Sequence, residues 1–128
     1  MRRIWVGREL DAPAPAVWAL LVDTGRWSDW GPSVVDARVD EPLRSGTTGV
    51  VTTIARVTLP FRITTFVPGV EWAWTVAGVP ATDHRVRPLD DDRCRVEFGV
   101  AWPAAPYLAV CKMALARLAE LVDTGVRT

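Results

Sequence analysis

The segment DAPAPAVWALLVDTGRWSDWGP, residues 11–32, holds three of the seven tryptophans of the chain between two groups of prolines. Pro13 and Pro15 supply the fixed φ angle that suits the first turn of a helix, and Asp11 is placed to cap that turn. Apolar residues then recur at helical spacing over residues 14–22. This pattern predicts a helix of about two turns, stopped by the polar residues and glycine that follow it.

Two tryptophans after this helix predict a second, shorter helix. Trp27 and Trp30 are three positions apart, so one helical turn would place both rings on the same side. Gly31 and Pro32 then end the turn. We expect a corner of two short helices that forms the side wall of an apolar pocket, with Trp18 and Trp30 in the core.

The pattern changes to β structure between residues 33 and 102. Short runs rich in valine and threonine alternate with prolines, glycines and one acidic turn, which is typical of strands joined by tight turns. Ile4, Val6 and Leu10 alternate with other residues over 2–10 and predict a first strand there. Because the later connections are short, neighbouring strands should be antiparallel. The six strands expected after the short helices cover residues 34–40, 48–56, 59–66, 71–77, 81–89 and 93–102.

Three of these strands have one face that is more apolar than the other, as expected for a half-buried sheet. Charged and apolar residues alternate over 93–102, and the strand over 71–77 carries two tryptophans on one side. His84 has the parity of Val86 and should therefore face the same concave surface. The residues predicted to face inward are Trp72, Trp74, Val76, His84, Val86, Cys94, Val96, Phe98, Val100 and Trp102.

The longest helix should follow Pro106 and run to about residue 123. Lys112, Arg117 and Glu120 lie on one side of it, opposite a single apolar stripe. A helix of this kind fits a position across a sheet. The stripe consists of Leu108, Cys111, Leu115, Leu118 and Val122.

The order of these elements predicts an α+β fold in a single domain of residues 1–128. It comprises a seven-stranded curved antiparallel sheet, two short helices after the first strand, and a long C-terminal helix over the concave face. One helix cannot fill the concavity of seven strands, so a gap should remain at one end, where the short helices would close it.

Composition excludes several classes of partner and cofactor. Fifteen basic and fifteen acidic residues cancel and no segment concentrates Lys or Arg, so we expect no nucleic-acid partner. No apolar run is long enough for a membrane span or a secretory signal, which predicts a cytoplasmic protein. Cys94 and Cys111 lack metal-ligand spacing and are more typical of buried thiols than of a disulfide. The acidic run 90–92 lacks the spaced oxygen ligands of a calcium site, and we expect no metal and no cofactor.

His84, the one histidine of the chain, is the first candidate for the chemistry of the pocket. An inward imidazole can hydrogen-bond a ligand carbonyl or act as an acid or base near neutral pH. The alternative is a histidine whose nitrogens are satisfied by protein neighbours. Asp83 cannot orient it, because adjacent residues of a strand point to opposite faces. No catalytic residue is assigned.

The remaining candidates are aromatic, apolar or basic. Inward tryptophans fit either a pocket wall or the core. Arg8 shares the parity of the apolar residues of the first strand and is a candidate anchor for a carboxylate, the alternative being an arginine that reaches solvent at a sheet edge. Tyr107 should lie near the pocket mouth. The candidate ligand-binding residues are His84, Trp72, Trp74, Phe98, Trp102, Arg8, Tyr107 and Leu115.

Three motifs resemble the START-like (SRPBCC) helix-grip superfamily, often labelled polyketide cyclase/dehydrase and lipid transport. The first is residues 11–32, with Ala-Pro, Val-Trp, Asp and Trp-x-x-Trp-x-Pro in order; the others are FVPGVEWAW, residues 66–74, and DHRVRPL, residues 83–89. The resemblance covers residues 4 to about 122 and implies the helix-grip fold. The loops between strands look shorter than is common in the superfamily.

The resemblance implies two functions of different classes. One is a binding module, monomer or homodimer, that encloses a hydrophobic or aromatic small molecule or lipid between the sheet and the C-terminal helix. The other is a cyclase or aromatase that bends a polyketide-like substrate and polarises a carbonyl with His84 or Arg8. A cyclase pocket should hold at least two converging polar groups, whereas a carrier pocket should be almost wholly apolar. In a dimer, Trp27 or Tyr107 of one copy would seal the pocket of the other.

Overall fold

A computed structural model describes residues 3–101 and 106–126, with side chains up to residue 122. The helices and strands are, in chain order, β1 (Arg3–Leu10), α1 (Ala14–Val22), the 3-10 helix η1 (Thr24–Arg26), α2 (Trp27–Trp30), β2 (Val34–Val39), β3 (Thr48–Thr53), β4 (Thr58–Val67), β5 (Glu71–Val76), β6 (Val79–Pro88), β7 (Cys94–Ala101) and α3 (Leu108–Val126). All the predicted strands are present. The largest difference is at the end of β3, which stops at Thr53 because residues 54–57 form the turn to β4.

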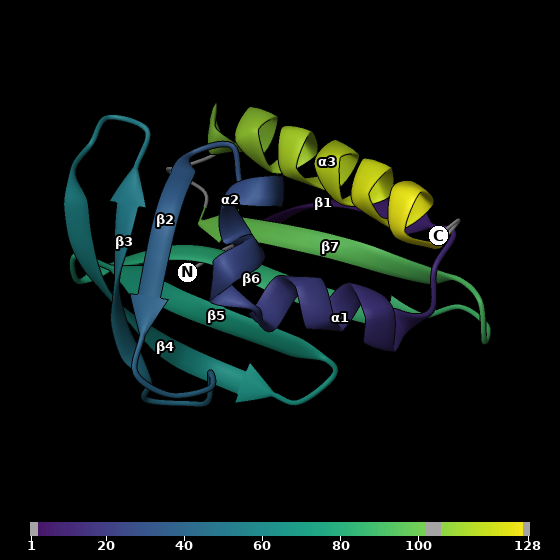
Figure 1. Cartoon of the computed structure of the whole chain (residues 1–128), viewed down its shortest axis with the longest axis horizontal. Helices are drawn as coiled ribbons and strands as arrows, with labels where there is room; N and C mark the ends of the chain where they lie inside the picture. The colour runs from purple at the N-terminus through teal and green to yellow at the C-terminus, as the bar shows by residue number, and fades with distance from the viewer. Residues whose placement is uncertain (1–2, 102–105, 127–128) are drawn as a thin grey trace.

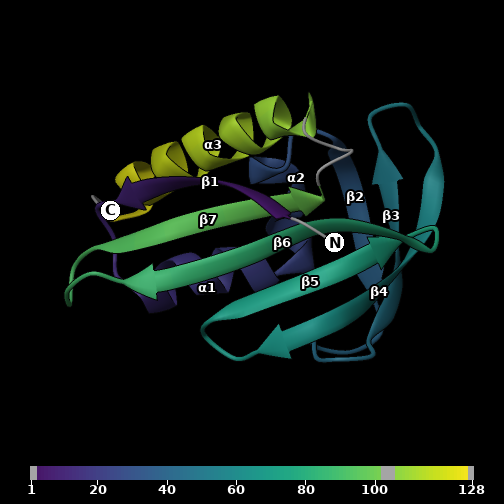
Figure 2. The ribbon, with the colours of Figure 1, turned by 180° about the vertical axis from the view of Figure 1, so that it is seen from behind.

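The strands form one antiparallel sheet in the order β1-β7-β6-β5-β4-β3-β2 (Figure 1). Strands β2 to β7 follow one another as a meander, and β1 pairs with β7 along its whole length, so β1 and β2 are the edges. Seen from behind, β1, β7, β6 and β5 lie in front of the helices, which share one face of this part of the sheet (Figure 2). The predicted α+β helix-grip architecture is confirmed.

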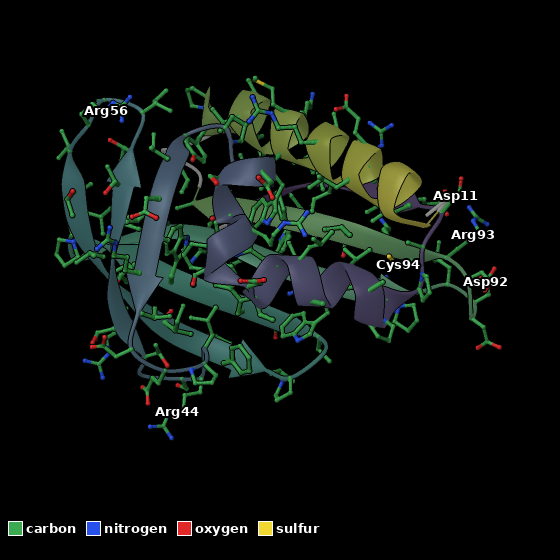
Figure 3. The ribbon with its side chains drawn as sticks, viewed as in Figure 1. Asp11, Arg44, Arg56, Asp92, Arg93 and Cys94 are labelled. Carbon is green, nitrogen blue, oxygen red and sulfur yellow. The ribbon has the colours of Figure 1, made fainter. Side chains whose placement is uncertain are left out.

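The first short helix begins where the prolines predict, but its cap differs from the prediction. Pro13 is the N-cap residue of α1 and makes no side-chain cap hydrogen bond. Asp11 lies two positions too early to reach the free N–H groups. Its carboxylate instead lies 3.5 Å from Nε of Arg93, at the far end of the molecule from the turn that holds Arg56 (Figure 3). The expected Asp11 cap is wrong.

Trp27 and Trp30 stabilise the C-terminal end of α1. The last carbonyl groups of a helix have no partner within it. The Trp27 Nε1–H donates to the Leu21 carbonyl over 2.9 Å, and the Trp30 Nε1–H donates to the Leu20 carbonyl over 3.0 Å. Two indoles of η1–α2 therefore satisfy the end of α1 and fix the corner between the helices.

The core lies between these helices and the sheet. Trp27 and Trp30 are buried, whereas Trp18 is only half-buried and packs its ring against Phe66, with 5.7 Å between ring centroids. The prediction of a core Trp18 is therefore wrong, because α1 presents Val17 and Leu21 to the interior instead. Trp27, 1% exposed, also cannot reach a partner copy to seal its pocket.

Helix α3 packs across β1 and β7 through the predicted stripe, widened by Ala114. Cys111, Leu115, Leu118 and Val122 are buried on it. Both cysteines are buried thiols that form no bridge with each other. None of the helices in the described ranges combines the length and apolar character that crossing a membrane requires.

Candidate functional site

A stack of three rings lies at the centre of the concave face. The rings of Trp27 and Trp72 are nearly parallel with centroids 5.2 Å apart, and the imidazole of His84 also stacks on Trp72, with centroids 3.8 Å apart. Phe98 and Trp74 meet this stack edge-on. These contacts follow from the register, since Trp72 pairs with His84 and His84 with Phe98 across neighbouring strands.

A register shift brings a hydroxyl to this cluster. Between Ala73 and Thr75, β6 carries one residue more than β5, which places Thr82 beside Trp74. The Trp74 Nε1–H donates to Thr82 Oγ1 over 3.0 Å. Thr82 Oγ1 lies 2.9 Å from Nε2 of His84.

The hydrogen bonds of His84 determine its tautomer. Its Nδ1 lies 3.3 Å from the Trp72 carbonyl, which can only accept, so Nδ1 carries the proton. Burial lowers the pKa of His84 to about 3, and the neutral ring must then accept at Nε2 from the Thr82 hydroxyl. Both nitrogens are satisfied by the protein. Asp83 points to the opposite face and pairs with Arg3 over 3.3 Å, as its parity predicts.

Beside this cluster, the concave face contains a cavity of about 50 Å³, which we call the inner pocket. Such a volume accommodates a few water molecules at most. His84, Trp72 and Phe98 line it from the sheet, and Cys111 lines it from α3. Burial raises the pKa of the Cys111 thiol to about 11, so this side chain is uncharged at neutral pH.

A larger cavity of about 340 Å³, the outer pocket, opens at the end of the sheet where β5, β6 and β7 approach the α2–β2 loop. Its walls are mainly aliphatic and aromatic. Its lining residues are Ser33, Val34, Val51, Thr53, Trp74, Val76, Pro80, Ala81, Thr82, Val100 and Tyr107. Five of them also line the inner pocket: Ser33, Val34, Trp74, Thr82 and Tyr107.

Two hydroxyl groups meet at the outer pocket. Ser33 Oγ, in the loop after Pro32, lies 2.9 Å from Oη of Tyr107, which directly precedes α3. Tyr107 is 39% exposed, so this pair lies where the pocket meets solvent. Partial burial raises the pKa of Tyr107 above its ordinary value, and the phenol is protonated at neutral pH.

The structure distributes the predicted site residues over different places. Trp74 and Tyr107 line both pockets, and His84, Trp72 and Phe98 line the inner one. Leu115 is core, 1% exposed, and is not among the lining residues of either pocket. Trp102 lies outside the described residues.

Arg8 is not brought to the site. It pairs with the buried Val96 and shares its face of the sheet, as parity predicts, but it is exposed. The reason is that β1 is an edge strand, where a long side chain reaches water past the sheet. Arg8 lines neither pocket. The prediction that it anchors a ligand carboxylate is therefore wrong, and the alternative, an arginine that reaches solvent at a sheet edge, is correct.

Two polar residues of the site were missed by sequence reasoning. Thr82 has the parity of His84 on the same strand, and this signal was sufficient to place its hydroxyl beside the imidazole. Ser33 carries no such signal, because it lies in a loop between Pro32 and β2. In the described parts of the chain, no three His, Cys, Asp or Glu side chains gather as a metal ion would require.

Comparison with known proteins agrees with this geometry. The sequence profile of the family described as polyketide cyclase / dehydrase and lipid transport matches residues 1–124. A comparison with curated proteins finds no match.

Solved structures share the fold at low sequence identity. The ZhuI aromatase/cyclase from Streptomyces sp. R1128 is 16% identical with a TM-score of 0.77, over 99% of this chain and 96% of that chain. A START superfamily protein from Mycobacterium smegmatis is 12% identical with a TM-score of 0.73, over 95% and 97%. A protein from Thermobifida fusca is 23% identical with a TM-score of 0.72, over 94% and 92%. Since the family profile spans nearly the whole sequence, the chain belongs to the polyketide cyclase / dehydrase and lipid transport family, as its tryptophan and Pro-Gly motifs indicate.

Proposed function

We propose that the protein binds a hydrophobic or aromatic small molecule or lipid in the outer pocket. The observation that carries this proposal is a cavity of about 340 Å³ with mainly apolar walls. Apolar concave sites with a few polar groups are typical of small-molecule binding. The space beneath the middle of α3 is filled by Leu115 and Leu118, and the outer pocket lies at one end of the sheet, where the order of elements predicts a gap.

The second candidate function is that of a cyclase or aromatase on a polyketide-like substrate. The Ser33–Tyr107 hydroxyl pair favours it, because a phenol in a partly dry site can hydrogen-bond and polarise a substrate carbonyl. The fold likeness to ZhuI aromatase/cyclase is consistent with the same function. His84 and Arg8 do not serve this mechanism, since both His84 nitrogens are bonded and Arg8 is exposed at an edge. Binding is therefore the first proposal, because it requires neither of these two groups, and the cyclase is the second.

Native mass spectrometry of the protein purified from its own host, followed by solvent extraction, tests the binding proposal. We expect an apolar compound to copurify with the wild type. Val76→Phe should lose it, because Val76 lines the outer pocket and a larger ring fills that space. Val67→Phe is the matched control, since Val67 is 42% exposed on β4 and lines neither pocket.

The extracted compound also separates the two functions. When the protein is incubated with a linear polyketide-type compound and then extracted, a carrier should return this compound unchanged. A cyclase should release a cyclised product whose mass is lower by the loss of water. A wild-type protein that copurifies with nothing and binds no added apolar compound would refute the binding proposal.

A further inference from the structure

The outer pocket lacks a counter-charge for an ionised ligand. Tyr107 is the one lining residue with an ionisable group among the described residues, and it is protonated at neutral pH. In the neighbouring inner pocket, His84 and Cys111 are uncharged as well. A carboxylate or ammonium group that enters this pocket would exchange part of its hydration for neutral hydroxyl groups and would find no side chain of opposite charge among the lining residues.

The hydroxyl groups of the pocket differ in what they can still donate. Thr82 accepts from Trp74 and gives its single proton to His84, so it offers a ligand no donor. The Ser33–Tyr107 pair has two hydroxyl protons, and the hydrogen bond between them uses one. The pair therefore retains one proton to donate, together with lone pairs that can accept.

The Ser33–Tyr107 pair lies at the mouth of the outer pocket. Tyr107 is 39% exposed and its bond to Ser33 is open to solvent, whereas Trp74, Thr82 and Val100 form more deeply placed walls. A ligand bound here would have its polar atom toward the mouth and its apolar body against Trp74 and Val100.

We propose that the outer pocket selects uncharged ligands with an apolar body and one carbonyl or hydroxyl oxygen, and that the Ser33–Tyr107 hydroxyl pair binds this oxygen at the mouth. This inference rests on the proposed binding function of the same pocket. It assigns a ligand class, neutral aromatic or alicyclic ketones and alcohols, which should bind in preference to fatty acids and other carboxylates in their ionised form.

Three probes of nearly equal shape test the ligand class. They are 2-acetylnaphthalene, which has a carbonyl, 2-naphthoate, which is an anion, and 2-ethylnaphthalene, which has no oxygen. Dissociation constants at pH 7.5 are measured by NMR titration of the tryptophan indole N–H signals. We expect 2-acetylnaphthalene to bind at least about tenfold more tightly than 2-naphthoate, because the anion loses part of its hydration and gains only a neutral hydroxyl donor, with no opposite charge in the pocket.

A double variant tests the hydroxyl pair. Ser33→Ala with Tyr107→Phe should weaken binding of 2-acetylnaphthalene about two- to tenfold, the usual range for one lost hydrogen bond, and leave binding of 2-ethylnaphthalene unchanged. Thr52→Val is the matched control. It removes one member of another exposed hydroxyl pair, Thr52 and Thr58, whose oxygens are 3.0 Å apart and which line neither pocket.

The outcomes separate this inference from the function beneath it. The proposed selectivity would be overturned, and the binding function kept, by either of two results. One is that 2-naphthoate binds the wild type as tightly as 2-acetylnaphthalene does. The other is that the double variant loses the same affinity for 2-acetylnaphthalene as for 2-ethylnaphthalene. Failure of all three probes to bind the wild type would overturn the binding function itself. The comparison of probes on the wild type needs no variant and is independent of any effect on folding.

Discussion

His84 shows how a titratable side chain in the right place can be unavailable for chemistry. Its sequence position predicts an inward imidazole, and the structure places it there with Nδ1 on the Trp72 carbonyl and Nε2 on Thr82. A ring with two protein partners and a pKa of about 3 neither accepts nor donates a proton near neutral pH. Its role is to hold Thr82, and through it Trp74, in one orientation.

The same burial makes stability depend on pH. The pKa of His84 is about 6.5 when unfolded and about 3 when folded, so between these values the unfolded chain binds one more proton. The contribution of the neutral His84 to the free energy of unfolding is fully present above pH 6.5 and is lost progressively as the pH falls toward 3. We expect the free energy of unfolding in urea to be about 2 kcal/mol lower at pH 5.0 than at pH 7.5.

His84→Gln is the control for this effect, since glutamine can still hydrogen-bond but does not titrate. The variant should show little change between the two pH values, where most carboxylates stay ionised in both states. An equal loss of stability in wild type and variant would show that His84 is not the cause.

Comparing Trp27 with Trp72 measures how much one indole hydrogen bond contributes to the free energy of unfolding. Each is 1% exposed and they stack on each other, but the Trp27 Nε1–H donates to Leu21 whereas the Trp72 Nε1–H is buried without a partner. Trp27→Phe should therefore lower the free energy of unfolding by about 1 kcal/mol more than Trp72→Phe. Chemical denaturation of both variants measures this difference, and equal losses would contradict the assigned hydrogen bond.

At the scale of elements, each strand boundary is decided by a turn. The β3–β4 hairpin closes with the Thr53 N–H on the Val57 carbonyl, and Arg56 has a left-handed φ of 64°. A residue with a Cβ atom is strained at a left-handed φ, whereas glycine is not. The periodicity of the strands could be read from the sequence, but an arginine gives no signal that the chain reverses there.

Arg56→Gly should relieve this strain. We expect the free energy of unfolding to rise by about 0.5 to 1 kcal/mol, since the gain exceeds the entropic cost of glycine. Arg44 is the matched control, an exposed loop arginine that is not among the described residues with positive φ and forms an ion pair with Glu41. Arg44→Gly should be neutral or destabilising in the same thermal or urea unfolding assay. A loss of stability in Arg56→Gly would contradict the strain argument.

At the scale of the whole molecule, three separate regions build the outer pocket. The ends of the central strands, the α2–β2 loop at Ser33 and the residue before α3 converge there. A ligand that bridges these regions binds only the folded chain, so it must stabilise the fold.

Ligand binding should therefore raise the stability of the protein by a calculable amount. At a concentration one hundred times its dissociation constant, 2-acetylnaphthalene should add about 2.7 kcal/mol to the free energy of unfolding. Val76→Phe should show no such gain, whereas Val67→Phe should show the full one. A gain that survives in Val76→Phe would place the ligand outside the outer pocket.

The sequence by itself determined the strands, the three helices, their order and the apolar stripe of α3, because period-two and period-3.6 patterns are local. It also placed His84, Trp72 and Trp74 on one face by parity. Only the tertiary structure decided that Trp27 is core and Trp18 half-buried, that Arg8 reaches water at an edge, and that Ser33 meets Tyr107 across 74 positions. These outcomes depend on the packing of the short helices, a sheet edge and a loop contact, and such long-range contacts have no local pattern from which they can be read.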